Sequence, residues 1–285
     1  MKIFYHDDTD GRCAAHVIGN QTYPIMSMDH SKYIAMDYNR PFPFDKVVKD
    51  ESVYIVDYSI STEDMDKLFD ITKNVVWIDH HQSSLEKYKG YDKKISGIRY
   101  NGLAGCVLTW IYMKYGSVTQ PSQYEWEVPE YIRLLGDYDT WTFKYGDRSL
   151  HFYFGMQSED TGPESRLWMD VKASKYLVDK LVGNGQIICK YRNQLYREML
   201  ATYGYKTTFE GHKAIVLNAE ANSNAFDSVA GKYDLNILVV WNGEVWTVSL
   251  YSKIVDVAKL AEKYGGGGHV QASGFATKEL PWSKS

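Results

Sequence analysis

Apolar residues in the first half of the chain form short runs separated by segments of helical period. Three nearly continuous runs of β-branched and aromatic residues occur at residues 2–6, 52–59 and 74–81. This composition is typical of strands that are buried on both faces. Between the last two runs, Ser61 is followed three residues later by Asp64, and apolar residues then recur at helical spacing. That pattern predicts a capped amphipathic helix, and the alternation of strand and helix predicts a parallel sheet.

The pattern changes twice along the rest of the chain. Residues 104–116 and 129–139 have helical periodicity, whereas residues 145–165 lose it and collect Gly, Ser and Asp. We predict a domain boundary or an active-site loop in that segment, followed by a long helical stretch over residues 165–204. After residue 205 strands and turns dominate, with a hairpin expected at Asn242-Gly243.

These patterns predict an α/β protein of two domains. The expected division is an N-terminal parallel-sheet domain with helices on both faces (residues 1–160), a helical connector (161–204) and a smaller α/β domain (205–285). In the smaller domain we expect a turn at Gly211, helices at 222–233 and 255–265, and a glycine run at 265–268.

Composition and charge narrow the possible functions. The 285 residues are 44% hydrophobic and 24% charged, which is the balance of a globular protein with real cores. A net charge of −4 argues against a protein that coats long duplex nucleic acid. Three cysteines without a CxxC pair indicate reduced thiols and a cytoplasmic location. No apolar run has the length of a membrane span, so we expect no membrane partner.

Ionisable residues directly follow the apolar run at all three predicted strand ends. They are His6, Asp8 and Asp10 at the first, Asp57 at the second, and Asp79, His80 and His81 at the third. The carboxyl ends of neighbouring parallel strands converge in one crevice. Carboxylates gathered there repel one another unless protons or metal ions neutralise them. Mixed carboxylate and imidazole ligands suit Mn²⁺ and similar ions. Asp137 and Asp139, in "GDYDTW" at the end of a predicted helix, are further candidates.

Each of these residues taken singly also has a structural interpretation. His6 is compatible with a packed histidine, Asp8 and Asp10 with caps of a helix near residue 11, and Asp57 with a cap of the helix that follows it. The "GDYDTW" segment is compatible with an acidic turn. Taken together, the residues favour a pair of divalent cations about 3.5–4 Å apart.

The motifs "HDDTDG", "VDYS", "IDHH" and "GDYDTW" resemble, in order and spacing, those of the DHH phosphoesterase superfamily. The C-terminal "GGGGHVQASGF" resembles the glycine-rich motif of the associated DHHA1 domain. The resemblance implies two divalent cations, Mn²⁺ foremost, with Mg²⁺ or Co²⁺ as alternatives. The metal ligands that it implies are His6, Asp8, Asp10, Asp57, His80 and either Asp139 or Asp137, of which Asp139 matches better.

The same resemblance implies roles for the remaining motif residues. Asp57 would bridge the two ions, and His81 would face the phosphate. Asp79 would be either a ligand or the partner that fixes an imidazole tautomer. One departure matters, because Arg12 stands where some branches, including family II pyrophosphatases, carry another Asp. The chain is therefore closer to the branch that resembles type B nanoRNases and, more distantly, RecJ exonucleases.

The glycine run is the candidate for substrate binding. Glycines let main-chain N–H groups approach an anion closely, and His269 adds a side-chain donor. We expect the run to form neither a packed helix nor a strand; a flexible linker is the alternative. The substrate-binding candidates are Gly266, Gly267, Gly268, His269, Arg12 and Asn222, although Asn222 fits a helix cap equally well.

The expected function is a metal-dependent phosphodiesterase, with His81 and Asp79 as the catalytic candidates, that hydrolyses short oligonucleotides or linear dinucleotides to mononucleotides. An acidic chain without a basic track suits a short single-stranded substrate. The alternatives are a small-phosphate hydrolase (cyclic dinucleotide, mononucleotide, pyrophosphate or polyphosphate) and a non-catalytic nucleotide-binding protein. The sequence leaves self-association open.

Overall fold

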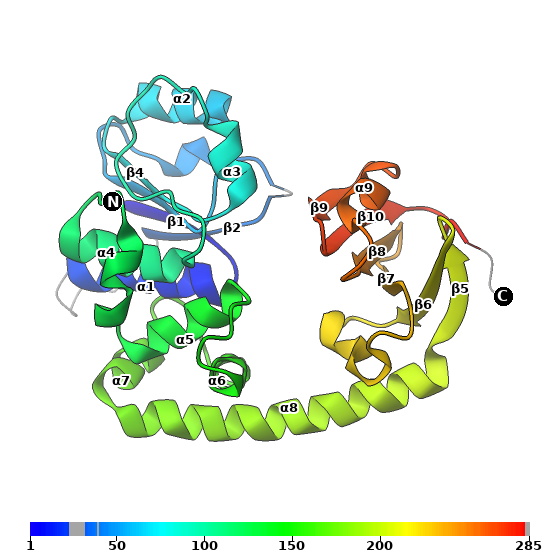
Figure 1. Cartoon of the computed structure of the whole chain (residues 1–285). Helices are drawn as coiled ribbons and strands as arrows, with labels where there is room; N and C mark the ends of the chain where they lie inside the picture. Colours follow the sequence, from blue (N-terminus) through cyan, green and yellow to red (C-terminus); the bar gives the residue numbers. More distant parts are fainter. Residues whose placement is uncertain (23–31, 39, 283–285) are drawn as a thin grey trace. The chain divides into compact units, whose positions relative to one another are not determined.

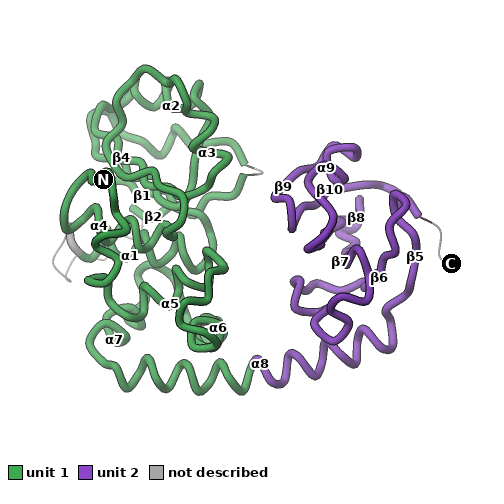
Figure 2. Tube along the Cα trace, in the orientation of Figure 1, with its two compact units in different colours: residues 1–188 green, residues 189–285 purple. Residues whose placement is uncertain are grey.

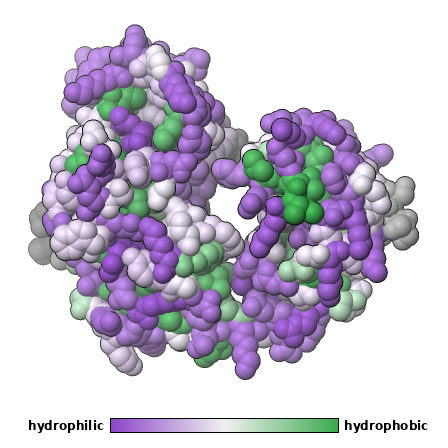
Figure 3. All heavy atoms as spheres, viewed as in Figure 1, coloured by the Kyte–Doolittle hydropathy of each residue, from purple (hydrophilic) through white to green (hydrophobic). Residues whose placement is uncertain are grey.

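The computed structural model describes residues 1–22, 32–38 and 40–282. The chain divides into two compact units, residues 1–188 and 189–285 (Figure 2). The division falls within helix α8 (Lys175–Tyr203), in the segment predicted to be a helical connector. The domain boundaries expected after residues 160 and 204 remain predictions. No described helix has both the length and the apolar character needed to cross a membrane. Hydrophilic residues cover most of the face shown in Figure 3.

A four-stranded parallel sheet forms the centre of the first unit (Figure 1). Its strands are β1 (Lys2–His6), β2 (Tyr33–Met36), β3 (Val53–Val56) and β4 (Val75–Ile78), in the order β2-β1-β3-β4. From β1 the chain passes to β2 on one side and then to β3 on the other. The gap between the carboxyl ends of β1 and β3 is therefore a switch point, where ligands bind in open α/β sheets. The predicted fold class is confirmed.

Alternate side chains of the strands pack into two different cores. Ile3 and Tyr5 pack on one face with helices α1 (Thr9–Thr22), α4 (Gly105–Tyr115) and α5 (Glu130–Asp139). Phe4 packs on the other face with α2 (Thr62–Ile71). The predicted cap of α2 is present, since Ser61 Oγ accepts a hydrogen bond of 3.0 Å from the Asp64 N–H. Both faces are thus covered, and only the strand ends remain available for chemistry.

One sequence prediction for the first unit was wrong in part. The segment 145–165 is not simply a loop, because it contains helix α6 (Asp147–Met156) with Phe152 and Met156 buried. The Gly, Ser and Asp residues of the segment masked the helical spacing of its apolar residues in the sequence. The long helical stretch predicted after residue 165 is present as α7 (Leu167–Ala173) and α8, which only Ser174 separates. The remaining short elements are α3 (Gln82–Lys87) and the 3₁₀ helices η2 (Phe44–Lys46) and η3 (Pro121–Glu127).

The second unit is a six-stranded mixed sheet in the order β5-β6-β7-β8-β10-β9. The strands are β5 (Tyr205–Phe209), β6 (His212–Asn218), β7 (Leu235–Trp241), β8 (Trp246–Tyr251), β9 (Gly267–His269) and β10 (Ala272–Thr277), and α9 spans Val257–Glu262. The predicted turns at Gly211 and at Asn242-Gly243 are present. The helix predicted at 222–233 is a 3₁₀ helix, η4 (Ser223–Val229), and Asn222 caps it by accepting a hydrogen bond from the Asn224 N–H.

The glycine run departs from its prediction. Gly267 and Gly268 belong to the edge strand β9 and pair with Gly274 and Ser273 of β10, so the expectation that the run forms no strand was wrong. A Cβ on Gly268 would lie 2.7 Å from the Ser273 Cα, and its φ is 140°. Only glycine allows this close approach and this backbone conformation together. His269, at the end of the strand, is exposed.

Helices α6 and α8 make a close contact through glycines. A Cβ on Gly185 would lie 1.6 Å from the His151 carbonyl oxygen, whereas a Cβ on Gly183 meets nothing within 4 Å. We expect Gly185→Ala to destabilise the protein by about 1–3 kcal/mol, because backbone must move. Gly183→Ala is the control and should stabilise it by roughly 0.5–1 kcal/mol through helix propensity. Urea unfolding of the two variants measures both, and equal effects would contradict the contact.

Candidate metal centre

The cluster of ionisable residues lies at the carboxyl edge of the first sheet. His6 ends β1, Asp57 follows β3, and Asp79 and His80 follow β4. The Asp57 N–H donates to the Ile78 carbonyl at 2.9 Å, so the sheet pairing continues up to the site. Asp57 has a φ of 52°, a left-handed conformation that is uncommon outside glycine and recurs at functional sites.

The Asp57 carboxylate is central to the cluster. It is 1% exposed, and its two oxygens face different imidazoles. Oδ1 lies 3.1 Å from His80 Nε2, and Oδ2 lies 3.9 Å from His6 Nδ1. This is the geometry needed for a carboxylate that bridges two cations.

Two sets of potential ligands lie beside each other in the cluster, and a third set, Asp57, His80 and His81, overlaps with both. In the first set His6, Asp8 and Asp57 offer ligand atoms within 4.8 Å of one another, and His6 Nδ1 lies 2.7 Å from Asp8 Oδ2. In the second set Asp10, His80 and Asp139 do the same, and His80 Nε2 lies 3.4 Å from Asp139 Oδ2. The sequence-predicted ligands therefore come together as two subsites that Asp57 joins.

The charge balance of the cluster fits bound divalent cations. Within the described part of the chain, Asp57 Oδ1 and Asp139 Oδ2 are buried and have no hydrogen-bond partner. Burial raises the pKa of both carboxyls well above the usual range, and repulsion from Asp10 and Asp8 raises it further. Burial lowers the pKa of His80, which favours the neutral imidazole that binds metals. Carboxylate and imidazole donors without thiolate suit Mn²⁺, Mg²⁺ or Co²⁺.

Asp79 fixes the orientation of His81. Its Oδ1 lies 2.7 Å from His81 Nδ1 and also accepts hydrogen bonds from the backbone N–H groups of His80 and His81. Burial opposes a charge on His81, but the hydrogen bond to Asp79 raises the pKa of the imidazole. An imidazole that donates from Nδ1 to a carboxylate directs Nε2 away from it. Of the two roles that the sequence left open for Asp79, the contacts favour the partner of an imidazole, although its Oδ2 has no partner among the described groups.

Asp137 and Asp139, the two candidate ligands in the fourth motif ("GDYDTW"), differ in their contacts. Asp139 reaches the cluster, whereas Asp137 holds the turn that follows α5. The oxygens of Asp137 accept hydrogen bonds from Thr142 Oγ1 (2.6 Å), the Lys144 N–H (2.7 Å), the Tyr145 N–H (3.2 Å) and Ser149 Oγ. Burial opposes ionisation, but these four donors lower the pKa of Asp137. Residues two positions apart on a helix point in different directions, which explains the separation.

Gly105, which the sequence analysis did not single out, lies against the cluster at the start of α4. Asp10 accepts hydrogen bonds from the N–H groups of Gly105 (2.7 Å) and Cys106 (2.9 Å) at the start of α4. A Cβ on Gly105 would lie 2.6 Å from the Asp57 Cβ and 2.9 Å from Asp10 Oδ2. Glycine is therefore required where this helix meets the carboxylates. The signal in the sequence was a glycine at the first position of a strongly apolar helix.

The remaining candidates have local partners or lie in the second unit. Asp8 Oδ1 caps α1 by accepting a hydrogen bond from the Gly11 N–H, while its Oδ2 faces His6. The Arg12 guanidinium contacts Asp7 Oδ1 at 3.0 Å and donates to Thr161 Oγ1. The candidates of the second unit are Gly266, Gly267, Gly268, His269 and Asn222. Substrate binding by Arg12 and by these five residues stays a prediction.

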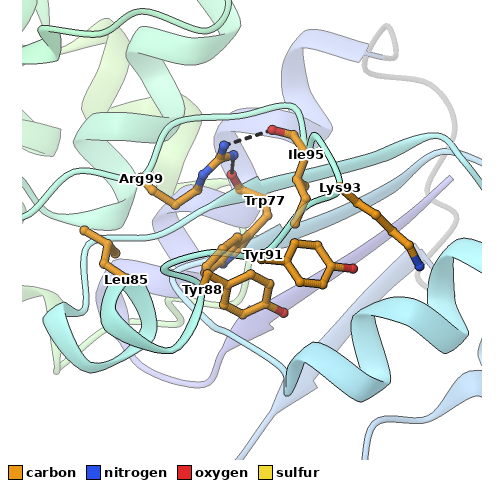
Figure 4. Close-up of a pocket in the computed structure, with 7 residues that line it drawn as sticks. All are labelled: Trp77, Leu85, Tyr88, Tyr91, Lys93, Ile95 and Arg99. Carbon is orange, nitrogen blue, oxygen red and sulfur yellow. Dashed lines mark hydrogen bonds between the residues drawn. The ribbon is translucent and has the colours of Figure 1, made fainter.

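Among the described residues of the first unit, two cavities bear on the site. One of about 70 Å³ adjoins the cluster and is lined by Asp8, Asp10, Tyr138 and Asp139, among others. A larger one, of about 220 Å³, lies around Trp77, Tyr88, Tyr91 and Arg99 (Figure 4). Its polar groups are engaged within the protein. Trp77 Nε1 donates to the Tyr58 carbonyl, Arg99 donates to the carbonyls of residues 77, 95 and 96, and Tyr91 and Lys93 donate to the Asp66 carboxylate. We therefore assign a structural role to the larger cavity.

Known proteins resemble the chain in sequence and in fold. No family model matches the sequence. The chain is 24% identical over 246 residues to the uncharacterized protein R106 of Acanthamoeba polyphaga mimivirus, and 22% identical over 245 residues to the oligoribonuclease NrnB of Bacillus subtilis strain 168. These matches cover 80% and 79% of the chain but 54% and 59% of the relatives. The chain thus spans less than two thirds of the length of either relative.

Two solved structures resemble the whole chain. The pGpG-specific phosphodiesterase PggH from Vibrio cholerae has a TM-score of 0.54 at 15% identity, with 97% of this chain and 93% of that one covered. An exopolyphosphatase-related protein from Bacteroides fragilis has a TM-score of 0.51 at 12% identity, with 98% and 86% covered. The motifs and the fold of the chain therefore resemble those of the DHH superfamily. The DHH triplet for which the superfamily is named is Asp79, His80 and His81, at the end of β4.

The fourth motif gives a matched pair of substitutions. We expect Asp139→Asn to weaken Mn²⁺ binding by at least ~10–100-fold, because a carboxylate oxygen of the cluster is lost. Asp137→Asn should leave Mn²⁺ affinity within a few-fold of the wild type but reduce the free energy of unfolding by about 1–3 kcal/mol, because it disturbs buried hydrogen bonds. Titration calorimetry and urea unfolding separate the two effects. Loss of metal binding in Asp137→Asn alone would contradict the assignment.

The repulsion between Asp57 and the neighbouring carboxylates predicts that removing the Asp57 charge stabilises the metal-free protein. Without metal, Asp57→Asn should raise the melting temperature by about 2–4 °C, because on the order of 1 kcal/mol of repulsion is relieved. The increase in melting temperature that Mn²⁺ causes in the wild type should be lost. Because the folded state retains a proton that the unfolded chain releases near pH 3.8, the metal-free wild type should lose stability as the pH rises above that value, and the variant should lose less. Thermal scans with and without chelator test this.

Proposed function

We propose that the protein is a metal-dependent phosphodiesterase that hydrolyses short oligonucleotides or linear dinucleotides to mononucleotides. The observation that carries the proposal is Asp57, whose two oxygens face two separate ligand sets. Two divalent cations held there would neutralise a phosphate and lower the pKa of a water molecule. The names of the relatives support a nucleotide substrate, since one is an oligoribonuclease and one structural neighbour is a pGpG-specific phosphodiesterase.

The residues of the chain would divide the work. Asp57, with His6 and Asp8 on one side and Asp10, His80 and Asp139 on the other, would hold the cations. His81, oriented by Asp79, would donate a hydrogen bond or a proton from Nε2 to the phosphate. A hydrogen bond to developing charge strengthens in the transition state, so His81 would act mainly on turnover. In the second unit, His269 and the glycines of β9 would bind substrate phosphate.

The overall charge supports a short substrate. A chain with a net charge of −4 lacks the bulk positive charge that proteins use to follow a long nucleic-acid backbone. A small-phosphate hydrolase is the second candidate, and the likeness to an exopolyphosphatase-related protein favours it. Arg12, at the position where pyrophosphatases of the superfamily carry an Asp, argues for a diester over pyrophosphate.

A substrate panel tests the proposal. With Mn²⁺, we expect the highest kcat/KM on a linear dinucleotide and a five-mer, lower values on a 24-mer and a cyclic dinucleotide, and little hydrolysis of pyrophosphate. Exhaustive chelation should abolish activity, and added Mn²⁺ should restore it. Chromatography of the products measures the hydrolysis of each substrate with Mn²⁺, after chelation and after Mn²⁺ is restored. A preference for pyrophosphate or polyphosphate would replace the proposal with the second candidate, and binding without hydrolysis of any substrate would indicate a nucleotide-binding protein.

A further inference from the structure

Two exposed aromatic side chains lie near the metal cluster, one in contact with His6 and one connected to the cluster through Tyr138. Tyr38 is 51% exposed and lies beside His6 of the first set. Trp141 is 53% exposed and follows Asp139 of the second set by two residues. Large aromatic rings gain stability from burial, so two that are half exposed beside a candidate active site suggest a ligand that covers them.

Tyr38 has the contacts of a stacking surface. Its ring stacks on Tyr58, with centroids 4.6 Å apart and planes 29° apart. It lies 5.7 Å from the His6 ring. Because Tyr58 covers one face, the exposed area belongs mainly to the opposite face and the edge. A ring supported in this way offers a fixed π-surface at little cost in side-chain entropy.

Trp141 is held in an unfavourable backbone conformation. Its φ is 56°, and that of Phe143 is 49°, although bulky residues rarely adopt the left-handed region. The Thr142 N–H donates to the Asp137 carbonyl, and the Asp137 carboxylate accepts hydrogen bonds from Thr142 Oγ1 and the Lys144 N–H. Asp137 thus holds a strained turn, and this turn places the Trp141 indole at the surface. Strain of this kind collects at ligand-binding positions.

The indole is also connected to the cavity beside the metal cluster. Trp141 packs on Tyr138 with ring centroids 5.4 Å apart, and Tyr138 lines that cavity together with Asp8, Asp10 and Asp139. One aromatic ring therefore separates the exposed indole from the carboxylates. Trp126 gives a contrast, because it is 73% exposed but belongs to η3 and lines neither cavity.

We propose that Tyr38 and Trp141 are stacking platforms for the two nucleobases that flank the scissile phosphate. The proposal rests on the proposed phosphodiesterase function and names its substrate unit, a linear dinucleotide step. A phosphate bound at Asp57 would have one nucleoside on each side. Tyr38 lies beside His6 of the first set, and Trp141 packs on Tyr138, which lines the cavity beside Asp10 and Asp139 of the second set. Every base has a π-face, so such platforms select for the presence of two bases and tolerate their identity.

The test combines enzyme variants with substrates that lack one base. Tyr38→Ala and Trp141→Ala are assayed with Mn²⁺ on a linear dinucleotide and on its two analogues that are abasic at the 5′ or the 3′ nucleoside. Each variant should lose roughly 5- to 150-fold in kcat/KM on the complete dinucleotide. It should lose nothing further on the analogue that lacks the base it stacks on, and the two variants should respond to opposite analogues. Tyr38→Phe and Trp141→Phe should retain most activity, and Mn²⁺ affinity should be unchanged throughout.

Trp126→Ala serves as the control for loss of an exposed indole and should match the wild type on all three substrates. Equal losses on the complete and both abasic substrates would overturn the proposal, as would a loss in Trp126→Ala equal to that in Trp141→Ala. If the wild type hydrolyses none of the three, the phosphodiesterase function fails separately. Titration calorimetry then tests base stacking separately from hydrolysis. The proposal is supported if the wild type binds the complete dinucleotide more tightly than the abasic analogues and the Ala variants lose this difference. Equal binding of all three by the wild type overturns it.

Discussion

The mutual repulsion of carboxylates at the carboxyl edge of the first sheet is the constraint on which the rest of this unit depends. Asp57 is almost fully buried at the switch point between β1 and β3, and the charges of Asp10, Asp8 and Asp139 add to the effect of burial in raising its pKa. Among the described residues, nothing donates a hydrogen bond to its Oδ1. A cluster of this kind is stable only when protons or cations balance its charge. The fold therefore maintains an arrangement that lowers its own stability, and divalent cations compensate it better than protons at neutral pH.

Other parts of the unit fix the direction of each carboxylate. The first two N–H groups of α4 donate hydrogen bonds to the Asp10 carboxylate. The carboxylate therefore lies at the positive end of the helix dipole. Gly105 permits this contact, because any side chain there would collide with Asp57. Asp79, in turn, is fixed by two backbone N–H groups before it orients His81. Carboxylates held by backbone N–H groups keep their direction without a metal ion, so the site would be organised before any cation bound.

Much of this arrangement follows from the sequence because it depends on local pattern and on one topological rule. Parallel strands that end in ionisable residues bring those residues together, and this predicts the meeting of His6, Asp57 and His80. Contacts set by tertiary packing were not predictable. The difference between Asp137 and Asp139 depends on donors in residues 142–149, a segment whose helix was hidden by its Gly, Ser and Asp content. The strand β9 formed against the weak propensity of glycine, because pairing with β10 outweighed it.

The fourth motif shows how one short segment links the metal centre to the surface beside it. Asp139 and Trp141 lie on either side of Thr140, the residue that caps α5, whose N–H and hydroxyl both donate to the Gly136 carbonyl. Asp137 holds the turn on one side of this point, and Asp139 faces the cluster on the other. If the Asp137 contacts were lost, the left-handed turn over residues 141–143 would relax, whereas the Thr140 hydrogen bonds to the Gly136 carbonyl would still hold the end of α5 and the direction of Asp139. Asp137 therefore supports the presentation of Trp141 and binds no metal itself. A carboxylate within a motif of candidate ligands can thus have a structural role beside the site without being a ligand.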